Sequence, residues 1–222
     1  MIRAVLFDLD GTLADTAPDL ARALNLQRTV RGLLPLPVSY LRRYASMGAR
    51  GLIRAGFDLD PADDRFHALC DEFHELYALD VCRETRLFPG MERVLDWLEA
   101  HGLAWGIVTN KIERYTLPLV KALGLDARAR TVVSGDTTPR AKPHAEPLLF
   151  ACGRCGITPS DCLYVGDDER DVQAAHAAGM RVAVARYGYL GSERPPETWG
   201  ADALIDAPTD LLPYLSGLRP AA

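Results

Sequence analysis

The chain has 222 residues, of which 48% are hydrophobic and 25% charged, and its formal net charge is −5. This length and apolar content suffice for one large core, or for a core with a small accessory domain. The mild acidic balance, with no basic block, argues against nucleic-acid binding, and no apolar run approaches the ~20 residues of a membrane span.

The first predicted element is a buried strand over residues 2–7, followed directly by the turn signal Asp8-Leu-Asp10-Gly11. Gly11 allows the backbone to turn sharply there. Ligands of open α/β sheets bind beyond the carboxyl ends of the strands. Asp8 and Asp10 therefore lie where the active sites of such proteins are usually found. The plainer alternative is that they are two acids in a solvated turn.

The next stretch, from Thr16 to about Arg83, has a helical pattern. Pro35-Leu-Pro37 and Ser46-Met-Gly48 interrupt it, and apolar residues recur at helical spacing after Pro61. No alternation typical of strands occurs here, and the stretch is too long for an ordinary loop. We therefore predict a helical insertion after the first strand.

From residue 86 onward, predicted strands and helices alternate. The strands are 103–109, 130–134, 162–165, 181–185 and 203–205, and the helices are centred on 91–98, 112–123, 144–155 and 172–178. This alternation predicts a parallel sheet with helices on both faces and all strand ends at one edge. The expected fold is α/β: a Rossmann-like parallel sheet core of residues 1–15 and 86–222, with an inserted helical cap domain of residues 16–85.

The five cysteines, at positions 70, 82, 152, 155 and 162, make an odd number, which argues against a disulfide framework. The N-terminus has no signal-peptide pattern, so we expect a cytoplasmic protein. Cys152 and Cys155 have the spacing of a metal or redox pair, but no second ligand pair for zinc is visible. We expect both to be inert, mostly buried side chains.

Polar side chains are expected to meet at the sheet edge that the strand ends share. Four segments fall at strand ends or in adjoining loops: Asp8-Leu-Asp10, Thr109-Asn110, Lys142-Pro143 and Gly166-Asp-Asp-Glu-Arg-Asp171. Each alone has an ordinary explanation, such as a turn, a helix cap, a solvated lysine or an acidic helix N-terminus. Their occurrence together, in this order, is much less expected by chance.

The order of these segments resembles the motifs of the haloacid dehalogenase (HAD) superfamily: D-x-D-G-T, a strand-end Thr or Ser, a Lys and an acidic G-D motif. The resemblance implies a phosphatase that works through an aspartyl-phosphate. Asp8 would be the nucleophile, Asp10 the general acid and base, and Lys142 a fixed positive charge beside Asp8.

A magnesium site is also implied by the resemblance. Asp8, the backbone carbonyl of Asp10 and Asp167 would hold Mg²⁺, which prefers oxygen ligands and offsets repulsion between neighbouring carboxylates. Asp171 is expected to support these ligands, and Asp168 is a competing ligand that the sequence does not separate from it.

Phosphate binding is assigned to the Thr109 hydroxyl, the Asn110 amide and Lys142, since phosphoryl transfer depends on positioning and charge stabilisation. Asp10 and Leu9 also distinguish the chain within the superfamily. Dehalogenases lack an acid two residues after the nucleophile, and P-type ATPases carry a lysine where Leu9 stands.

Four stretches resemble bacterial phosphoglycolate phosphatases: 7–20, 87–91, 109–111 and 164–171, and residues 187–189 and 199–202 also fit that branch. The favoured reaction is therefore hydrolysis of 2-phosphoglycolate to glycolate and phosphate beneath a closing cap. A close branch that acts on N-acetylmuramic acid 6-phosphate is the alternative, and it shares the cap segment 45–50. A sugar phosphomutase is less favoured because Thr12 replaces the usual hydrophobic residue, and a non-enzymatic binding module is a third hypothesis.

The substrate side of the site is expected in the insertion. Arg43 and Arg50 are candidates for binding a substrate carboxylate, with exposed, solvated arginines as the plainer alternative. The expected partner is a small-molecule phosphate monoester, with no nucleic acid and no membrane. The chain is expected to be a monomer or homodimer.

Overall fold

The computed structural model describes residues 1–218, so the last four residues of the expected core domain, 219–222, lie outside the described residues. Its main sheet has six parallel strands in the order β5-β4-β1-β6-β7-β8. The strands are β1 (Ala4–Phe7), β4 (Ala104–Val108), β5 (Val132–Val133), β6 (Cys162–Gly166), β7 (Arg181–Ala185) and β8 (Ala203–Ile205). The predicted α/β class and parallel sheet are confirmed.

Strand β1 lies in the middle of the sheet and is fully buried, because all four of its residues are apolar. Phe7, its last residue, pairs with Ile107 of β4 and with Val165 of β6. The ends of these three strands therefore lie side by side. Residues that follow them in the sequence meet at one edge, which is what positions the site.

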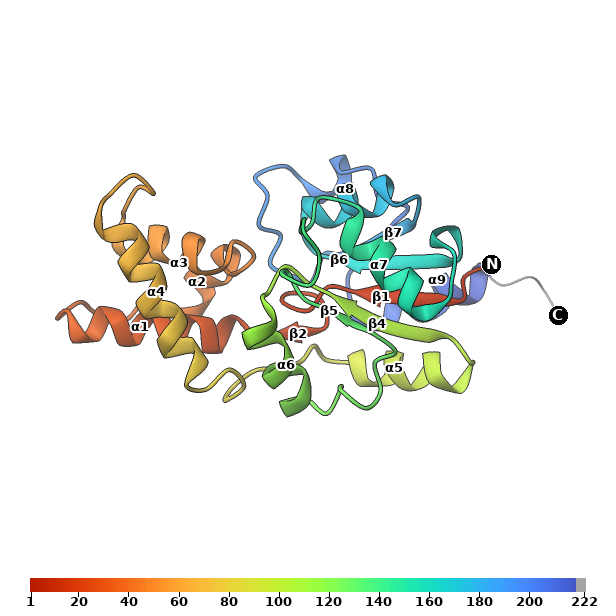
Figure 1. Ribbon diagram of the computed structural model, residues 1–222, viewed down its shortest axis with the longest axis horizontal. Helices are drawn as coiled ribbons and strands as arrows, with labels where there is room; N and C mark the ends of the chain where they lie inside the picture. Colours follow the sequence, from red (N-terminus) through yellow and green to blue (C-terminus); the bar gives the residue numbers. More distant parts are fainter. Residues whose placement is uncertain (219–222) are drawn as a thin grey trace.

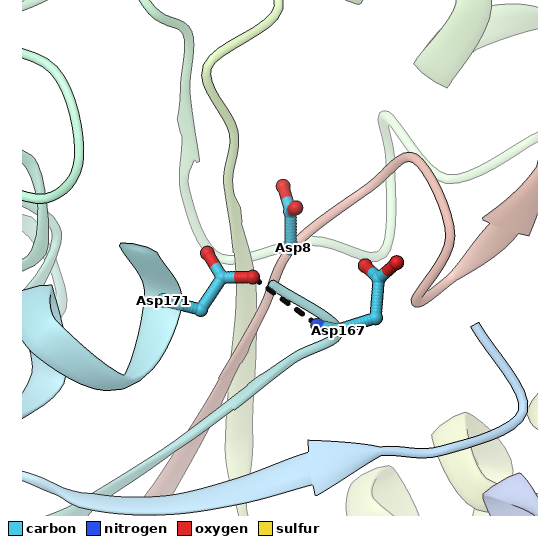
Figure 2. Close-up of side chains that lie close together, drawn as sticks. All are labelled: Asp8, Asp167 and Asp171. Carbon is cyan, nitrogen blue, oxygen red and sulfur yellow. Dashed lines mark hydrogen bonds between the residues drawn. The ribbon is translucent and has the colours of Figure 1, made fainter. Parts of the chain in front are cut away.

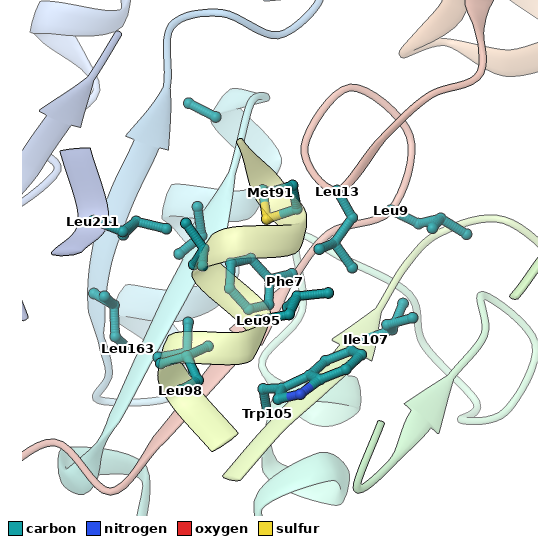
Figure 3. Packing of buried hydrophobic residues seen from close by; sticks show 14 of the residues in the cluster. Phe7, Leu9, Leu13, Met91, Leu95, Leu98, Trp105, Ile107, Leu163 and Leu211 are labelled. Atoms are coloured by element: carbon teal, nitrogen blue, oxygen red, sulfur yellow. The ribbon is translucent and has the colours of Figure 1, made fainter. Parts of the chain in front are cut away.

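Helices cover both faces of the sheet, and alternate residues of β1 serve the two faces. Val5 and Phe7 pack with α5 and α9, whereas Ala4 and Leu6 pack with α7 and α8. Figure 3 shows α5 across the first face. The helices of this part are α5 (Met91–Ala100), α6 (Glu113–Ala122), α7 (Glu146–Cys155), α8 (Glu169–Ala177) and α9 (Leu211–Gly217), with short 3₁₀ turns at Pro159–Asp161, Pro196–Thr198 and Pro208–Asp210.

A unit of four helices, called here the helical insertion, follows β1 and stands beside the sheet (Figure 1, red to orange). It comprises α1 (Ala17–Val30), α2 (Val38–Ala45), α3 (Gly48–Phe57) and α4 (Arg65–Ala78). Its apolar side chains form a cluster of their own, built around residues such as Leu24, Leu52 and Phe73. The interruptions between α1, α2 and α3 fall at the two predicted breaks.

Two short strands that the sequence analysis did not predict connect the insertion to the sheet. Strands β2 (Ala14–Asp15) and β3 (Arg86–Leu87) form an antiparallel pair at the two ends of the insertion. Two residues are too few to show a period in a sequence. The predicted strand 130–134 is likewise reduced to β5, and the predicted helix 144–155 begins two residues later.

The five cysteines are free, as expected; Cys70, Cys152 and Cys162 are buried, and Cys82 and Cys155 are partly buried. Within residues 1–218, none of the helices combines the length and apolar character needed to cross a membrane.

Candidate active site

The two acids after β1 are held by a tight turn in which Gly11 has φ +82°. A Cβ atom on residue 11 would lie 2.3 Å from Oδ2 of Asp167. Glycine is therefore required at this position for two reasons. It allows the positive φ angle, and it leaves room for the side chain of Asp167. The turn brings the β1 end and the β6 end into contact.

Three carboxylates gather at this edge, as Figure 2 shows: Asp8 after β1, Asp167 after β6 and Asp171 in the first turn of α8. One oxygen from each lies within 4.8 Å of the others. The Asp171 carboxylate also accepts hydrogen bonds from the backbone N–H groups of Asp167 and Asp168, both at 3.1 Å. These bonds fix α8 to the end of β6 and orient the acidic cluster.

The neighbouring Asp168 points elsewhere. It caps α8 by accepting from the backbone N–H of Arg170 at 3.0 Å, and its carboxylate pairs with the Arg170 guanidinium at 2.9 Å. Of the two acids that the sequence analysis could not separate, the structure brings Asp171 into the cluster and turns Asp168 towards Arg170.

Lys142 lies in the loop before α7, and its almost fully buried ammonium reaches the cluster. Its Nζ atom is 3.0 Å from Oδ1 of Asp8 and 2.7 Å from Oδ1 of Asp171. Burial alone would lower the pKa of Lys142, but these two carboxylates raise it above its ordinary value. The lysine is therefore charged at neutral pH and sits where the sequence analysis expects it.

The positive charge of Lys142 does not balance the negative charge of the three carboxylates. Burial raises the pKa of Asp8 to about 6, with Lys142 opposing the shift and Asp171 adding to it. Burial, together with Asp8 and Asp171, raises the pKa of Asp167 well above its ordinary value. A cluster of buried oxygen donors with excess negative charge fits a hard divalent cation such as Mg²⁺.

Asp10 has partners that the sequence analysis missed. Its carboxylate accepts from Nζ of Lys111 at 2.9 and 3.1 Å and from the hydroxyl of Thr16. The Lys111 ammonium also lies 4.9 Å from the centre of the Tyr77 ring, which belongs to the insertion. The available signal was the position of Lys111 directly after Thr109-Asn110, at the end of β4.

Thr109 and Asn110 lie at the edge, but their side chains have partners within the protein. The Thr109 hydroxyl accepts from the backbone N–H of Lys111 at 3.2 Å. The Asn110 side chain donates to the backbone carbonyl of Lys142 at 2.9 Å and accepts from its N–H at 3.0 Å. Asn110 thus holds the lysine loop against the end of β4, a role that the sequence analysis did not foresee.

A cavity of about 290 Å³ opens between this edge and the insertion. Asp8, Asp10, Lys111 and Lys142 are among the residues on the sheet side. The insertion contributes Leu20, Ala45, Ser46, Met47, Gly48, Ala49, Phe73, His74 and Tyr77. The cavity therefore has a charged floor and a mainly apolar and aromatic roof.

Arg43 and Arg50, the candidates for binding a substrate carboxylate, do not line this cavity. Both are exposed, and their guanidinium groups lie over the rings of Tyr44 and Phe66, at 5.5 and 5.6 Å from the ring centres. The structure therefore supports the alternative of solvated arginines.

A parallel sheet whose strand ends gather three acids and a lysine beneath a helical insertion has the architecture of a HAD-type hydrolase. The model of the haloacid dehalogenase-like hydrolases matches residues 5–185, and the chain belongs to this family. The resemblance to the haloacid dehalogenase superfamily that the sequence predicted is thereby confirmed.

Named relatives cover nearly the whole chain. It is 41% identical over 210 residues to the N-acetylmuramic acid 6-phosphate phosphatase of Pseudomonas putida, covering 95% of this chain and 94% of the relative. It is 43% identical over 207 residues to a phosphoglycolate phosphatase of Xylella fastidiosa, covering 93% and 90%. The crystal structure of a predicted phosphoglycolate phosphatase from Haemophilus somnus has a TM-score of 0.83 at 29% identity, covering 96% of this chain and 98% of that one.

Proposed function

We propose that the protein is a Mg²⁺-dependent phosphatase that hydrolyses small phosphate monoesters through an aspartyl-phosphate on Asp8. The observation that carries this proposal is the contact of Asp8 with Lys142 inside the acidic cluster, at 3.0 Å. A nucleophilic carboxylate beside a fixed cation is what phosphoryl transfer to an aspartate requires. The carboxylates of Asp8 and Asp167 and the backbone carbonyl of Asp10 would hold Mg²⁺, with Asp171 adjacent.

When bound, Mg²⁺ would neutralise charge on the phosphoryl oxygens. In our proposal Asp8 attacks phosphorus, and Asp10 in its protonated form gives its proton to the departing alkoxide. Asp10 then takes a proton from the water that attacks the aspartyl-phosphate, which releases phosphate and restores Asp8. Thr16 and Lys111 hold the Asp10 carboxylate for these proton transfers, and Thr109, Asn110 and Lys142 surround the phosphate.

The helical insertion is proposed to act as a cap. The Ser46–Met47 turn and the aromatic residues of α4 form the roof of the cavity above Asp8. Closure of such a roof excludes water while the ester is bound, and opening it releases the product. The division into a core of 1–15 and 86–222 and a cap of 16–85 belongs to this proposal.

Two substrates are proposed, and the relatives support them equally: 2-phosphoglycolate and N-acetylmuramic acid 6-phosphate. One observation favours the sugar phosphate. The roof contributes no lysine or arginine to the cavity, and the cations that line it, Lys111, Lys142 and Arg170, are all paired with aspartates. Among the residues of 1–218 that line the cavity, no lysine or arginine is left unpaired for a phosphoglycolate carboxylate.

A sugar ring would suit the same surroundings better, since apolar and aromatic side chains pack against its C–H groups. N-Acetylmuramic acid also carries a carboxylate, but the sugar ring separates it from the 6-phosphate, so it need not lie beside the paired cations that surround the phosphate. His74 is one of the polar residues of the roof, and burial lowers its pKa, so it is an uncharged hydrogen-bonding partner at neutral pH.

Phosphate release from both esters, measured with and without Mg²⁺, tests the proposal. We expect turnover only with the metal, and none from Asp8→Asn, whereas Asp60→Asn at an exposed position should match the unsubstituted protein. Turnover by Asp8→Asn would refute the assigned nucleophile. Release of phosphate without an added bisphosphate excludes the phosphomutase, and binding of both esters without any turnover would support the binding module.

A further inference from the structure

Tyr164 is a buried polar residue that the proposed reaction does not use. It lies in β6, pairs with Leu6 of β1 in the sheet register, and has no solvent exposure. Its ring extends past β1, so that its hydroxyl donates a hydrogen bond to the backbone carbonyl of Val108, the last residue of β4, at 2.8 Å. The phenol thus joins two strands that are not neighbours in the sheet.

The same hydroxyl accepts a hydrogen bond from the Lys142 ammonium at 2.7 Å. An ammonium has three N–H groups, and this one has three acceptors: Asp8 at 3.0 Å, Asp171 at 2.7 Å and the Tyr164 hydroxyl. Every donor of Lys142 is therefore used, and its position is set from three directions.

The three acceptors differ in what happens to them during the proposed reaction. Asp8 loses its negative charge to a phosphoryl group when the aspartyl-phosphate forms. Asp171 takes part in the acidic cluster that would surround the metal. The Tyr164 hydroxyl is uncharged, belongs to a central strand and is held by Val108, so its contact with the lysine is unchanged as the charge on Asp8 changes.

We propose that Tyr164 is a positioning residue whose hydroxyl keeps the Lys142 ammonium beside Asp8 throughout the reaction. This inference rests on the proposed function. Tyr164 does not line the cavity, so it acts on the reacting atoms through the lysine and makes no contact with the substrate.

Tyr164→Phe tests this role, because it removes one oxygen and keeps the ring in place. We expect kcat to fall about tenfold, which corresponds to about 1.4 kcal/mol, while KM stays within about twofold because the cavity lining is unchanged. Tyr214→Phe, at a partly buried tyrosine of α9, is the matched control and should retain kcat.

An unchanged kcat, or a change in KM alone, would overturn the inference. Thermal melting separates a loss of folded protein from a loss of turnover, and repeating the assay with trimethylamine N-oxide, which favours the folded state, covers a destabilised variant. Asp8→Asn distinguishes the two levels of failure. If it is inactive and Tyr164→Phe is fully active, only the role of Tyr164 is lost; if Asp8→Asn is active, the proposed function itself fails.

Discussion

At the scale of single residues, the site concentrates negative charge that the rest of the fold must tolerate. Asp8, Asp167 and Asp171 lie within contact range of one another, and Lys142 is the cation placed among them. Burial raises the pKa of Asp8 to about 6, which is an unfavourable free-energy term for the ionised protein. Acids with strongly shifted pKa values are common at functional sites, where catalytic residues often lower the stability of the folded protein.

This term predicts a stability that depends on pH in the metal-free protein. The folded state holds a proton on Asp8 up to about pH 6, whereas the unfolded chain loses it near the ordinary aspartate pKa of 3.8. The stabilising contribution is therefore present at low pH and is lost as the pH rises through about 6. Asp8→Asn removes this loss, so at pH 7.5 the variant should be more stable by on the order of 2 kcal/mol, or about 5 °C in Tm.

Melting curves at pH 5 and 7.5 in the presence of a chelator provide the measurement. The unsubstituted protein should lose more Tm between these two values than Asp8→Asn does. Equal losses would show that Asp8 does not titrate in this window. Both values lie above the range in which acids with lowered pKa, such as Asp19, begin to take up protons.

Lys111 gives a second prediction at this scale. It holds Asp10, the proposed acid, through both carboxylate oxygens. Lys111→Met should lower kcat about tenfold for alkyl phosphates, which need a proton on the leaving oxygen, and less than about threefold for p-nitrophenyl phosphate, which does not. Lys121→Met, on the exposed face of α6, is the control. An equal loss with both esters would assign Lys111 to phosphate binding instead of to Asp10.

The sequence predicted which residues meet, but not all of their partners. Asp8 and Asp167 follow from the rule that parallel strands end at one edge, and Lys142 follows from the resemblance to the haloacid dehalogenase motifs. The bonds of Asn110 to the Lys142 backbone, and of Tyr164 to Lys142, depend on the length and direction of single side chains. No periodicity or spacing in the sequence encodes such contacts, because they are set by the three-dimensional packing.

At the scale of elements, the insertion is attached through a small number of polar contacts at its ends. The Tyr189 hydroxyl accepts from the backbone N–H groups of Thr16 and Ala17 at 2.7 and 2.9 Å, which satisfies two donors at the start of α1. It also donates to Asp15, which pairs with Arg42 of α2 at 2.7 Å. The two-residue strands β2 and β3 were not predicted, because they depend on the contacts at this junction and not on a pattern of residues in the sequence.

The turn between α2 and α3 is held from the sheet side by one guanidinium. Arg170 at the start of α8 donates to the backbone carbonyl of Ser46 at 2.8 Å, and the turn lines the cavity. Arg170→Ala should free the turn and raise KM about fivefold with a smaller effect on kcat, since Asp8 and Lys142 keep their partners. Arg154→Ala on α7 is the exposed control. A fall in kcat at constant KM would instead place Arg170 in the chemical step.

At the scale of the whole molecule, apolar packing joins the insertion to the sheet part. The cluster of the insertion includes Tyr115 and Tyr189 from the sheet side, so contacts cross between the two parts. His74 of α4 stacks on Tyr115, and Glu75 pairs with Arg114 of α6 at 2.9 Å. These contacts hold the insertion over the site, and the polar junction at its base is the connection about which it would turn if it opens as proposed.

A covalent bridge across this contact tests whether the insertion must move. Glu75 and Arg114 are largely exposed, at 67% and 53% of their side chains, so cysteines at both positions can be joined by a short bis-maleimide. If the cap must open to release product, the bridged protein should lose at least about tenfold in kcat, and each single cysteine variant treated with the same reagent should not. The treated unsubstituted chain controls for reaction at Cys82 and Cys155, which are only partly buried. Full turnover by the bridged protein would mean that substrate and product pass through a fixed opening, and that the insertion shapes the site without moving over it.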